Sequence, residues 1–197
     1  ISQADLDARV RGREAVDRYT AMGDALAAVD RDIVYSICEW GENAPWEWGR
    51  NVGGHCWRAT DDLVANWRAD PAEFGLGIAD VLDRIAEIDA AAHGPGGWND
   101  PDMLQIGTGP ESGQSEHEAV DVQRPLTEAE RRTHFAFWCL LAAPLMIGAN
   151  LTSLSDFDRE LLTNERLLAI DQDPLGVQGT PDRRDGGGGG RRPPGRS

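Results

Sequence analysis

Short apolar runs alternate along this chain with longer stretches in which apolar residues recur at helical spacing. The runs are short enough for buried strands, whereas the stretches between them are long enough for helices that pack one face on a core. This alternation is typical of a parallel α/β fold, although the pattern alone does not separate an open sheet from a closed barrel. The expected strands are 33–37, 55–58, 103–107 and 145–147.

Local signals set the expected helix boundaries. Helical spacing predicts a first helix from Glu14 to Val29. Thr127 and Glu130 form a capping-box pattern before a helix over 131–142, which Pro144 ends. Ser155 is expected to cap a final helix to about residue 169. The second helix shows one apolar face, formed by Phe74, Ile78, Val81, Leu82, Ile85 and Ile88.

The expected strands amount to about half of an eight-stranded barrel. We therefore expect residues 1–179 to form part of a (β/α)8 domain. After Gly179 the periodicity gives way to glycine, arginine and proline, so 180–197 is predicted to be a disordered tail. The chain starts at Ile1 without a methionine, which suggests that it begins inside a longer protein.

Composition argues against several classes of partner. Acidic residues outnumber basic ones 34 to 19, and the body of the chain has no basic patch for nucleic acid or an anionic membrane. No apolar run is long enough to span a bilayer. The sequence has no phosphate loop, dinucleotide fingerprint or zinc-binding helix, and its three cysteines are too few for a zinc cluster, so we expect neither cofactor nor metal.

Two candidate clusters follow expected strands, where a barrel places its active site. Glu39 and Trp40 could bind a sugar, because a carboxylate accepts hydroxyl hydrogen bonds and an indole stacks on the apolar face of a ring; the alternative is a capped strand end. Asp62 could be a general acid and base near Arg58, although a pair such as Asp61 and Asp62 before a helix is more often an N-cap or a partner of the helix dipole.

A third cluster is the acidic turn Asp100-Pro101-Asp102. Its two carboxylates could bind hydroxyl groups. Calcium is the rival ligand, but the stretch offers too few oxygen atoms for it.

Five motifs occur in order and at plausible spacing, and together they resemble the α-galactosidases of glycoside hydrolase family 27. The resemblance covers roughly residues 19–179. The motifs are Ile33 to Gly41 (IVYSICEWG), Trp57-Arg58 with Asp62, Gly96 to Leu104 (GGWNDPDML), Ala142 to Leu145 (AAPL) and Ala169 to Gly176 (AIDQDPLG).

The resemblance implies the second half of a (β/α)8 barrel, normally preceded by the first half and followed by a β-sandwich domain. It assigns the general acid/base to Asp62 and the substrate pocket to Glu39, Trp40, Arg58 and Asp102. It also implies that Asp100 ties its turn together while Asp102 points at the sugar. Cys38 matches a position whose disulfide partner is absent from this chain.

The family hydrolyses terminal α-galactosyl residues by a retaining mechanism that uses a second carboxylate as nucleophile. The nucleophile motif of the family has no match before residue 19, so the resemblance implies an inactive fragment of an α-galactosidase. Other specificities of the family, α-N-acetylgalactosaminidase and β-L-arabinopyranosidase, remain open, although Glu39 beside Trp40 favours a free 2-hydroxyl over an acetamido group. A non-catalytic carbohydrate-binding product is also open. The sequence assigns no compartment, and a secreted parent protein would fit the family.

Overall fold

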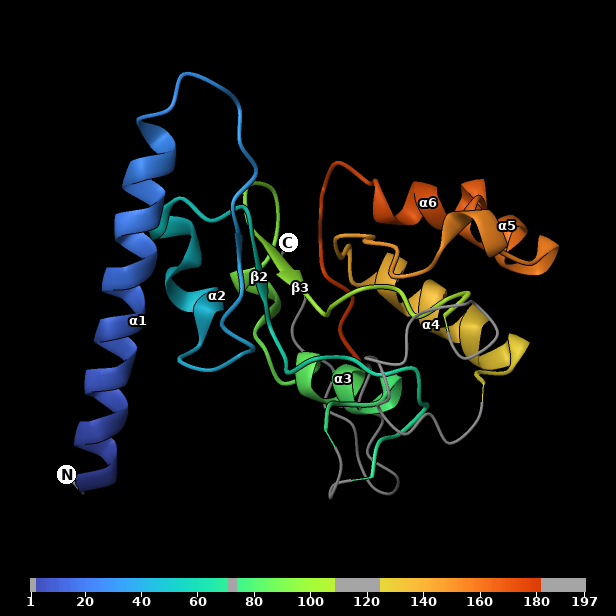
Figure 1. The fold of residues 1–197 in the computed structure, drawn as a ribbon, viewed down its shortest axis with the longest axis horizontal. Coiled ribbons are helices and arrows are strands. Elements are labelled where there is room, and N and C mark those ends of the chain that lie inside the picture. Colours follow the sequence, from blue (N-terminus) through green and yellow to red (C-terminus); the bar gives the residue numbers. More distant parts are fainter. Residues whose placement is uncertain (1–2, 71–73, 109–124, 182–197) are drawn as a thin grey trace, which may run out of the picture.

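Three short parallel strands form the centre of the molecule. The computed structural model describes residues 3–70, 74–108 and 125–181. The strands β1 (Ser36–Ile37), β2 (Cys56–Arg58) and β3 (Trp98–Asp100) lie in the order β1-β2-β3, with β2 between its neighbours (Figure 1). Ser36 pairs with Cys56, and Arg58 pairs with Asp100. All three strands therefore end at the same edge, and the predicted parallel α/β fold is confirmed.

Helices flank this sheet on two sides. The long helix α1 (Gln3–Ala27) and the short α2 (Pro45–Trp48) lie beside β1, and α4 (Glu128–Leu140), α5 (Asp156–Leu162) and α6 (Glu165–Asp171) group beyond β3 (Figure 1). Helix α3 (Ile78–Ile85) lies between these groups. Short 3-10 turns cover Gly49–Val52, Ala90–Ala92 and Leu151–Ser153. Within the described residues, no helix is both long and apolar enough to cross a membrane.

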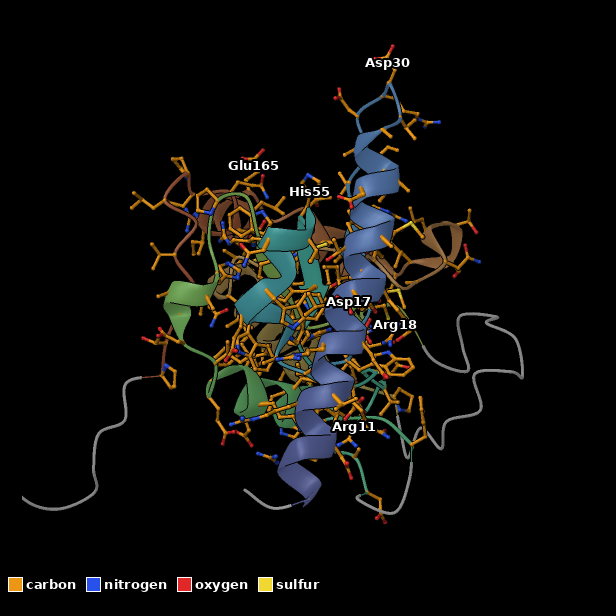
Figure 2. The ribbon with its side chains drawn as sticks, turned by 90° about the vertical axis from the view of Figure 1, so that its left-hand side faces the viewer. Arg11, Asp17, Arg18, Asp30, His55 and Glu165 are labelled. Atoms are coloured by element: carbon orange, nitrogen blue, oxygen red, sulfur yellow. The ribbon has the colours of Figure 1, made fainter. Side chains whose placement is uncertain are left out.

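Two apolar clusters hold these elements together. The larger one joins α3 and α4 to the segment after β3, and its fully buried members include Ile78, Val81 and Trp138. The smaller one packs Tyr35, Ile37, Val52 and Trp57 against α1 and α2. Figure 2 shows α1 from the side, with Arg11, Asp17 and Arg18 along its length. Most residues of α1 are exposed, so this helix contributes little to the core.

The sequence located the capping residues of two helices correctly, although α4 covers Glu128–Leu140 rather than 131–142. The Thr127 hydroxyl accepts a hydrogen bond from the Glu130 backbone N–H, and the Glu130 carboxylate accepts one from Thr127 N, which confirms the capping box. Ser155 caps a helix as expected. That helix ends at Leu162, however, because the Asn164 side chain accepts hydrogen bonds from Arg166 N and Leu167 N and starts α6 as a separate helix.

Other boundaries were wrong. Helix α1 begins at Gln3 rather than Glu14, and the first strand covers only Ser36–Ile37. Phe74 lies outside α3 and is exposed, so it is not part of the apolar face. The third strand is Trp98–Asp100, just before the expected strand 103–107, whereas 103–107 and 145–147 share only the parallel bridge between Leu104 and Ile147. The tail from residue 182 lies outside the described residues.

Candidate active site

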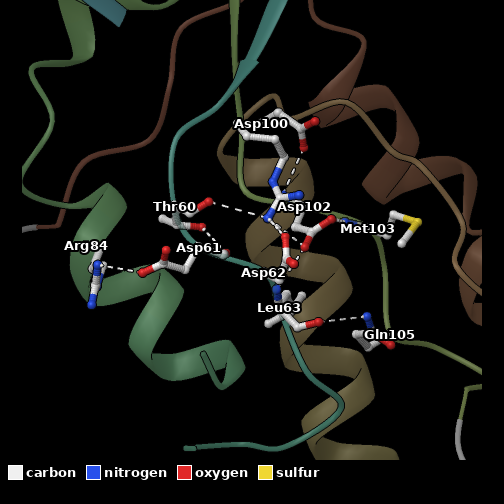
Figure 3. Close-up of polar contacts among 10 residues, drawn as sticks. Thr60, Asp61, Asp62, Leu63, Arg84, Asp100, Asp102, Met103 and Gln105 are labelled. Carbon is white, nitrogen blue, oxygen red and sulfur yellow. Dashed lines mark hydrogen bonds and ion pairs between the residues drawn. The ribbon is translucent and has the colours of Figure 1, made fainter. Parts of the chain in front are cut away.

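The ends of the three parallel strands bring the predicted residues to one edge of the sheet. Glu39 and Trp40 follow β1, Arg58 is the last residue of β2, and Asp102 follows β3 by two residues. Asp62 lies four residues after Arg58 on the same connection. Figure 3 shows Asp62 and Asp102 side by side with the backbone that carries them.

Arg58 joins the two carboxylates directly. Its Nη2 atom lies 2.8 Å from Asp102 Oδ2 and 3.1 Å from Asp62 Oδ1. The side chains of Arg58 and Asp102 are 11% and 8% exposed, whereas that of Asp62 is 39% exposed. An ion pair this far from water is weakly screened, so Arg58 can fix both carboxylates while Asp62 remains open to a ligand.

The Asp100-Pro101-Asp102 turn is held by its own side chains. Asp102 has a φ of 81°, in the left-handed region that residues other than glycine rarely adopt. Asp100 Oδ1 accepts a hydrogen bond from Asp102 N at 2.9 Å, and Asp102 Oδ1 accepts one from Met103 N at 2.7 Å. Burial raises the pKa of Asp100 to about 6. Asp100 thus ties the turn, while Asp102 faces Arg58.

Asp62 opens onto a cavity of about 770 Å³. The exposed rings of Trp40 and Phe74 lie in its wall together with several carboxylates. The helix-cap alternative for Asp61 and Asp62 was wrong, because α3 begins after Gly77 and the Asp61 carboxylate lies 3.3 Å from Arg84 Nη1. The acidic members of the wall are Glu42, Asp61, Asp62, Asp70, Asp80 and Asp83.

Glu39 makes its side-chain contacts on the α1 side of the site. Its Oε1 atom accepts a hydrogen bond from Asn43 Nδ2 at 2.7 Å, and its Oε2 atom lies 4.0 Å from Arg18 Nη2. Glu39 itself is buried, whereas Trp40 is half exposed with a φ of 53°. The structure therefore gathers Arg58, Asp62 and Asp102 tightly and holds Glu39 through other partners.

The tryptophan-rich segment after β1 contributes only one of its three indole rings to the cavity. Trp46 packs against both apolar clusters, and Trp48 packs against the smaller one while its Nε1 atom donates to Asn43 O at 2.8 Å. Of the three tryptophans in this segment, only Trp40 has an exposed ring that also lines the cavity. Trp46 and Trp48 are therefore structural residues of the loop.

The three cysteines are free thiols, exposed at Cys38 and buried at Cys56 and Cys139. Among the described residues, no group of three or more His, Cys, Asp or Glu side chains is arranged to hold a metal ion. The side chains described at the site are carboxylates, one guanidinium and aromatic rings.

Sequence reasoning missed a layer of residues behind the site. Trp57 Nε1 donates to Asn99 Oδ1 at 2.7 Å, and Asn99 Nδ2 donates to Gln178 Oε1 at 2.9 Å. His134 and Trp138, on α4, contact the backbone of the segment after β3. The spacing of His134 and Trp138, four residues apart on one helix face, was the one signal available for them.

Comparison with known proteins adds the family. The family model of the melibiases that is described as "Alpha galactosidase A" matches residues 7–173 of this chain. The chain belongs to this α-galactosidase family. It is 39% identical over 163 residues to alpha-galactosidase A of Cellvibrio japonicus, covering 81% of this chain and 36% of that protein. It is 38% identical over 178 residues to alpha-galactosidase of Oryza sativa, and this match covers 89% of this chain and 36% of that protein.

Solved structures of the family show the same arrangement. A putative alpha-galactosidase from Bacteroides fragilis matches with a TM-score of 0.78 and 38% identity, over 88% of this chain and 35% of that one. The α-galactosidase of Saccharomyces cerevisiae, solved with raffinose, matches with a TM-score of 0.74 and 30% identity, over 86% and 37%. The chain thus spans about a third of the length of these relatives, and its parallel α/β arrangement matches part of their (β/α)8 barrel.

Proposed function

We propose that this chain forms the acid/base side of an α-galactosidase active site, which hydrolyses terminal α-D-galactosyl residues. Asp62 is the general acid and base, and Arg58, Asp102, Glu39 and Trp40 bind the sugar. The observation that carries this proposal is the pairing of one buried guanidinium with two carboxylates of unequal exposure. Family membership supplies the substrate class.

Asp62 has the setting that proton transfer requires. Its carboxylate is held by Arg58 Nη2 on one side and reaches the 770 Å³ cavity on the other. A positioned carboxyl group can protonate the leaving oxygen and then remove a proton from water. We assign the cavity beside Asp62 to the leaving group, with Trp40 and Phe74 as its apolar surfaces.

Asp102 is unsuited to be the nucleophile of a retaining reaction. Its Oδ2 atom contacts Arg58 and Leu63 N, and its Oδ1 atom accepts from Met103 N. A carboxylate with both oxygens bound and almost no exposure cannot easily approach an anomeric carbon. We infer that the nucleophile lies on the other half of the barrel, outside this second half, and that residues 1–197 alone lack turnover.

Other specificities have less support. A β-L-arabinopyranosidase of Geobacillus stearothermophilus also resembles the chain, but with 25% identity and a TM-score of 0.61. Both its sequence identity and its TM-score are lower than those of the α-galactosidases compared above. No contact in the described site favours an acetamido sugar. Galactoside hydrolysis is therefore the function we put forward.

The test is release of nitrophenol from 4-nitrophenyl α-galactoside. In the full-length protein that contains this chain, Asp62→Asn should lower kcat by at least about a hundredfold, the lower end of general acid–base contributions, because hydrolysis of the glycosyl-enzyme needs the base even when nitrophenolate leaves unaided. The neighbouring Asp61→Asn is the matched control and should keep most activity, because Asp61 faces Arg84. Equal losses in both variants would refute the role of Asp62. Turnover by residues 1–197 alone would refute the inferred position of the nucleophile.

A further inference from the structure

Two side chains on one face of α4 hold the backbone that follows β3. Trp138 Nε1 donates to Asp102 O at 2.8 Å, and His134 Nε2 accepts from Gln105 N at 2.9 Å. Both side chains are fully buried, and their rings meet edge to face with centroids 4.1 Å apart. A single rigid helix face therefore fixes two points of the segment 102–105.

This segment in turn holds the residue next to Asp62. Leu63 N donates to Asp102 Oδ2 at 2.8 Å, and Leu63 O accepts from Gln105 Nε2 at 3.1 Å (Figure 3). Both backbone polar groups of Leu63 are thus bound by the segment that α4 fixes. A shift of 102–105 would move Leu63, and Asp62 with it.

The conformation of Asp102 adds a reason for so many restraints. A left-handed φ at an aspartate is unfavourable and persists only where the surrounding contacts determine it. Asp100 Oδ1 binds the N–H of Asp102, and Trp138 Nε1 binds its carbonyl oxygen. The peptide units on both sides of the strained residue are therefore held by buried side chains.

We propose that His134 and Trp138 are positioning residues that set the geometry of Asp62 and Asp102 from behind the site. The expected effect on hydrolysis rests on the proposed function, whereas the placement of the segment 102–105 by α4 does not. His134 must stay neutral to accept the Gln105 N–H, and burial lowers its pKa to about 3. The hydrogen bond from Gln105 N to His134 is therefore intact at neutral pH.

The test is Trp138→Phe in the full-length protein that contains this chain, since phenylalanine keeps an aromatic ring while losing the N–H donor together with the pyrrole half of the indole. Hydrolysis of methyl α-galactoside, which has a poor leaving group, should fall by roughly tenfold to a hundredfold in kcat/KM, the scale of a small misplacement at a catalytic group. The loss on 4-nitrophenyl α-galactoside should be several-fold smaller, because nitrophenolate leaves with little help from the acid.

Phe135→Leu is the matched control, because Phe135 is equally buried on the same helix and belongs to the apolar cluster. It should lower stability with equal effects on the two substrates. If Trp138→Phe also affects both substrates equally, its role is structural and the proposal is overturned.

Hydrogen exchange tests the geometry without activity. The amides of Leu63 and Met103 should exchange about tenfold faster in Trp138→Phe than in Phe135→Leu, after correction for global stability, because their acceptor Asp102 loses its support. Unchanged exchange overturns the proposal. A wild-type protein that hydrolyses neither substrate would contradict the proposed function, and the exchange result would still decide whether α4 positions this segment.

Discussion

Arg58 Nη2 lies 2.8 Å from Asp102 Oδ2, and this contact links the ends of β2 and β3 across the buried floor of the site. The same nitrogen reaches Asp62, which is the more exposed of the two carboxylates. One guanidinium therefore organises a buried acidic group and an accessible one. The proposed roles of the two carboxylates differ because the side chains differ in exposure and in the number of hydrogen bonds that they accept.

Replacing Arg58 tests this link. Arg58→Met should remove the charge that compensates Asp102 and lower the free energy of unfolding by roughly 3 kcal/mol, the usual scale for breaking a buried pair. Activity of the full-length protein should fall as well. Arg68→Met is the control, since its pairs with Asp80 and Asp83 are exposed and should contribute little. Urea unfolding measures both variants, and similar effects would contradict the buried-pair argument.

Gly41 should tolerate no side chain. Its φ is +76°, and an added Cβ would collide with the carbonyl oxygen of Ala59 beside the site. Gly41→Ala should lower stability by roughly 2 kcal/mol or more. Gly12→Ala, in α1, meets its nearest atom at 3.8 Å and should instead stabilise the helix by about 0.5–1 kcal/mol. Thermal unfolding of the two variants should show shifts of opposite sign.

The ionisation of Asp100 should make stability depend on pH. Burial raises its pKa from 3.8 to about 6, so between these values the folded state holds a proton that the unfolded state has lost. The contribution of Asp100 to the free energy of unfolding is fully present below pH 3.8 and is lost as the pH rises through 6. Asp100→Asn cannot ionise, so its stability relative to wild type should rise by roughly 3 kcal/mol across this window.

Urea unfolding of wild type and Asp100→Asn from pH 3.5 to 7 measures this difference. His134 has the opposite sign, because its lowered pKa makes its contribution disappear as the pH falls from 6.5 toward 3. Since His134 is present in both proteins, its effect cancels in the comparison. A difference that stays constant with pH would show that Asp100 does not titrate as described.

The N-cap of α4 should matter for the helix that supports the site. Thr127→Ala removes the hydroxyl that binds Glu130 N and should cost about 1 kcal/mol. Thr133→Ala, inside the same helix and half-buried, should be neutral or slightly stabilising because alanine is the better helix former. Chemical unfolding distinguishes the two, and equal losses would argue against the capping box as a source of stability.

The acidic cavity beside Asp62 should disfavour negatively charged leaving groups. Six carboxylates lie in its wall against one guanidinium, that of Arg84. We expect the full-length protein to hydrolyse 4-carboxyphenyl α-galactoside several-fold less efficiently in kcat/KM than the corresponding methyl ester, which is neutral but otherwise similar. The gap should narrow at high salt, because exposed charges are screened. Equal kcat/KM values at low salt would contradict this assignment of the cavity.

The amino-acid sequence determined much of this protein by itself. Alternating apolar periodicity predicted the parallel α/β fold, and local cap chemistry located the starts of α4 and α5, because these signals act within a few residues. Motif resemblance placed Arg58, Asp62 and Asp102 at one edge of a sheet. Parallel strands end on the same side, so residues that follow such strands are expected to meet.

Tertiary structure alone decided the remaining features. Strand β3 is Trp98–Asp100 because it pairs with the buried β2, a long-range choice that its glycine-rich surroundings concealed. Trp46, in the short helix α2, packs against both apolar clusters, whereas Phe74, which was expected on an apolar helix face, is exposed. His134 and Trp138 reach Gln105 and Asp102 only because α4 packs behind β3. Such contacts join residues about 30 positions apart, and no local pattern encodes which of them will meet.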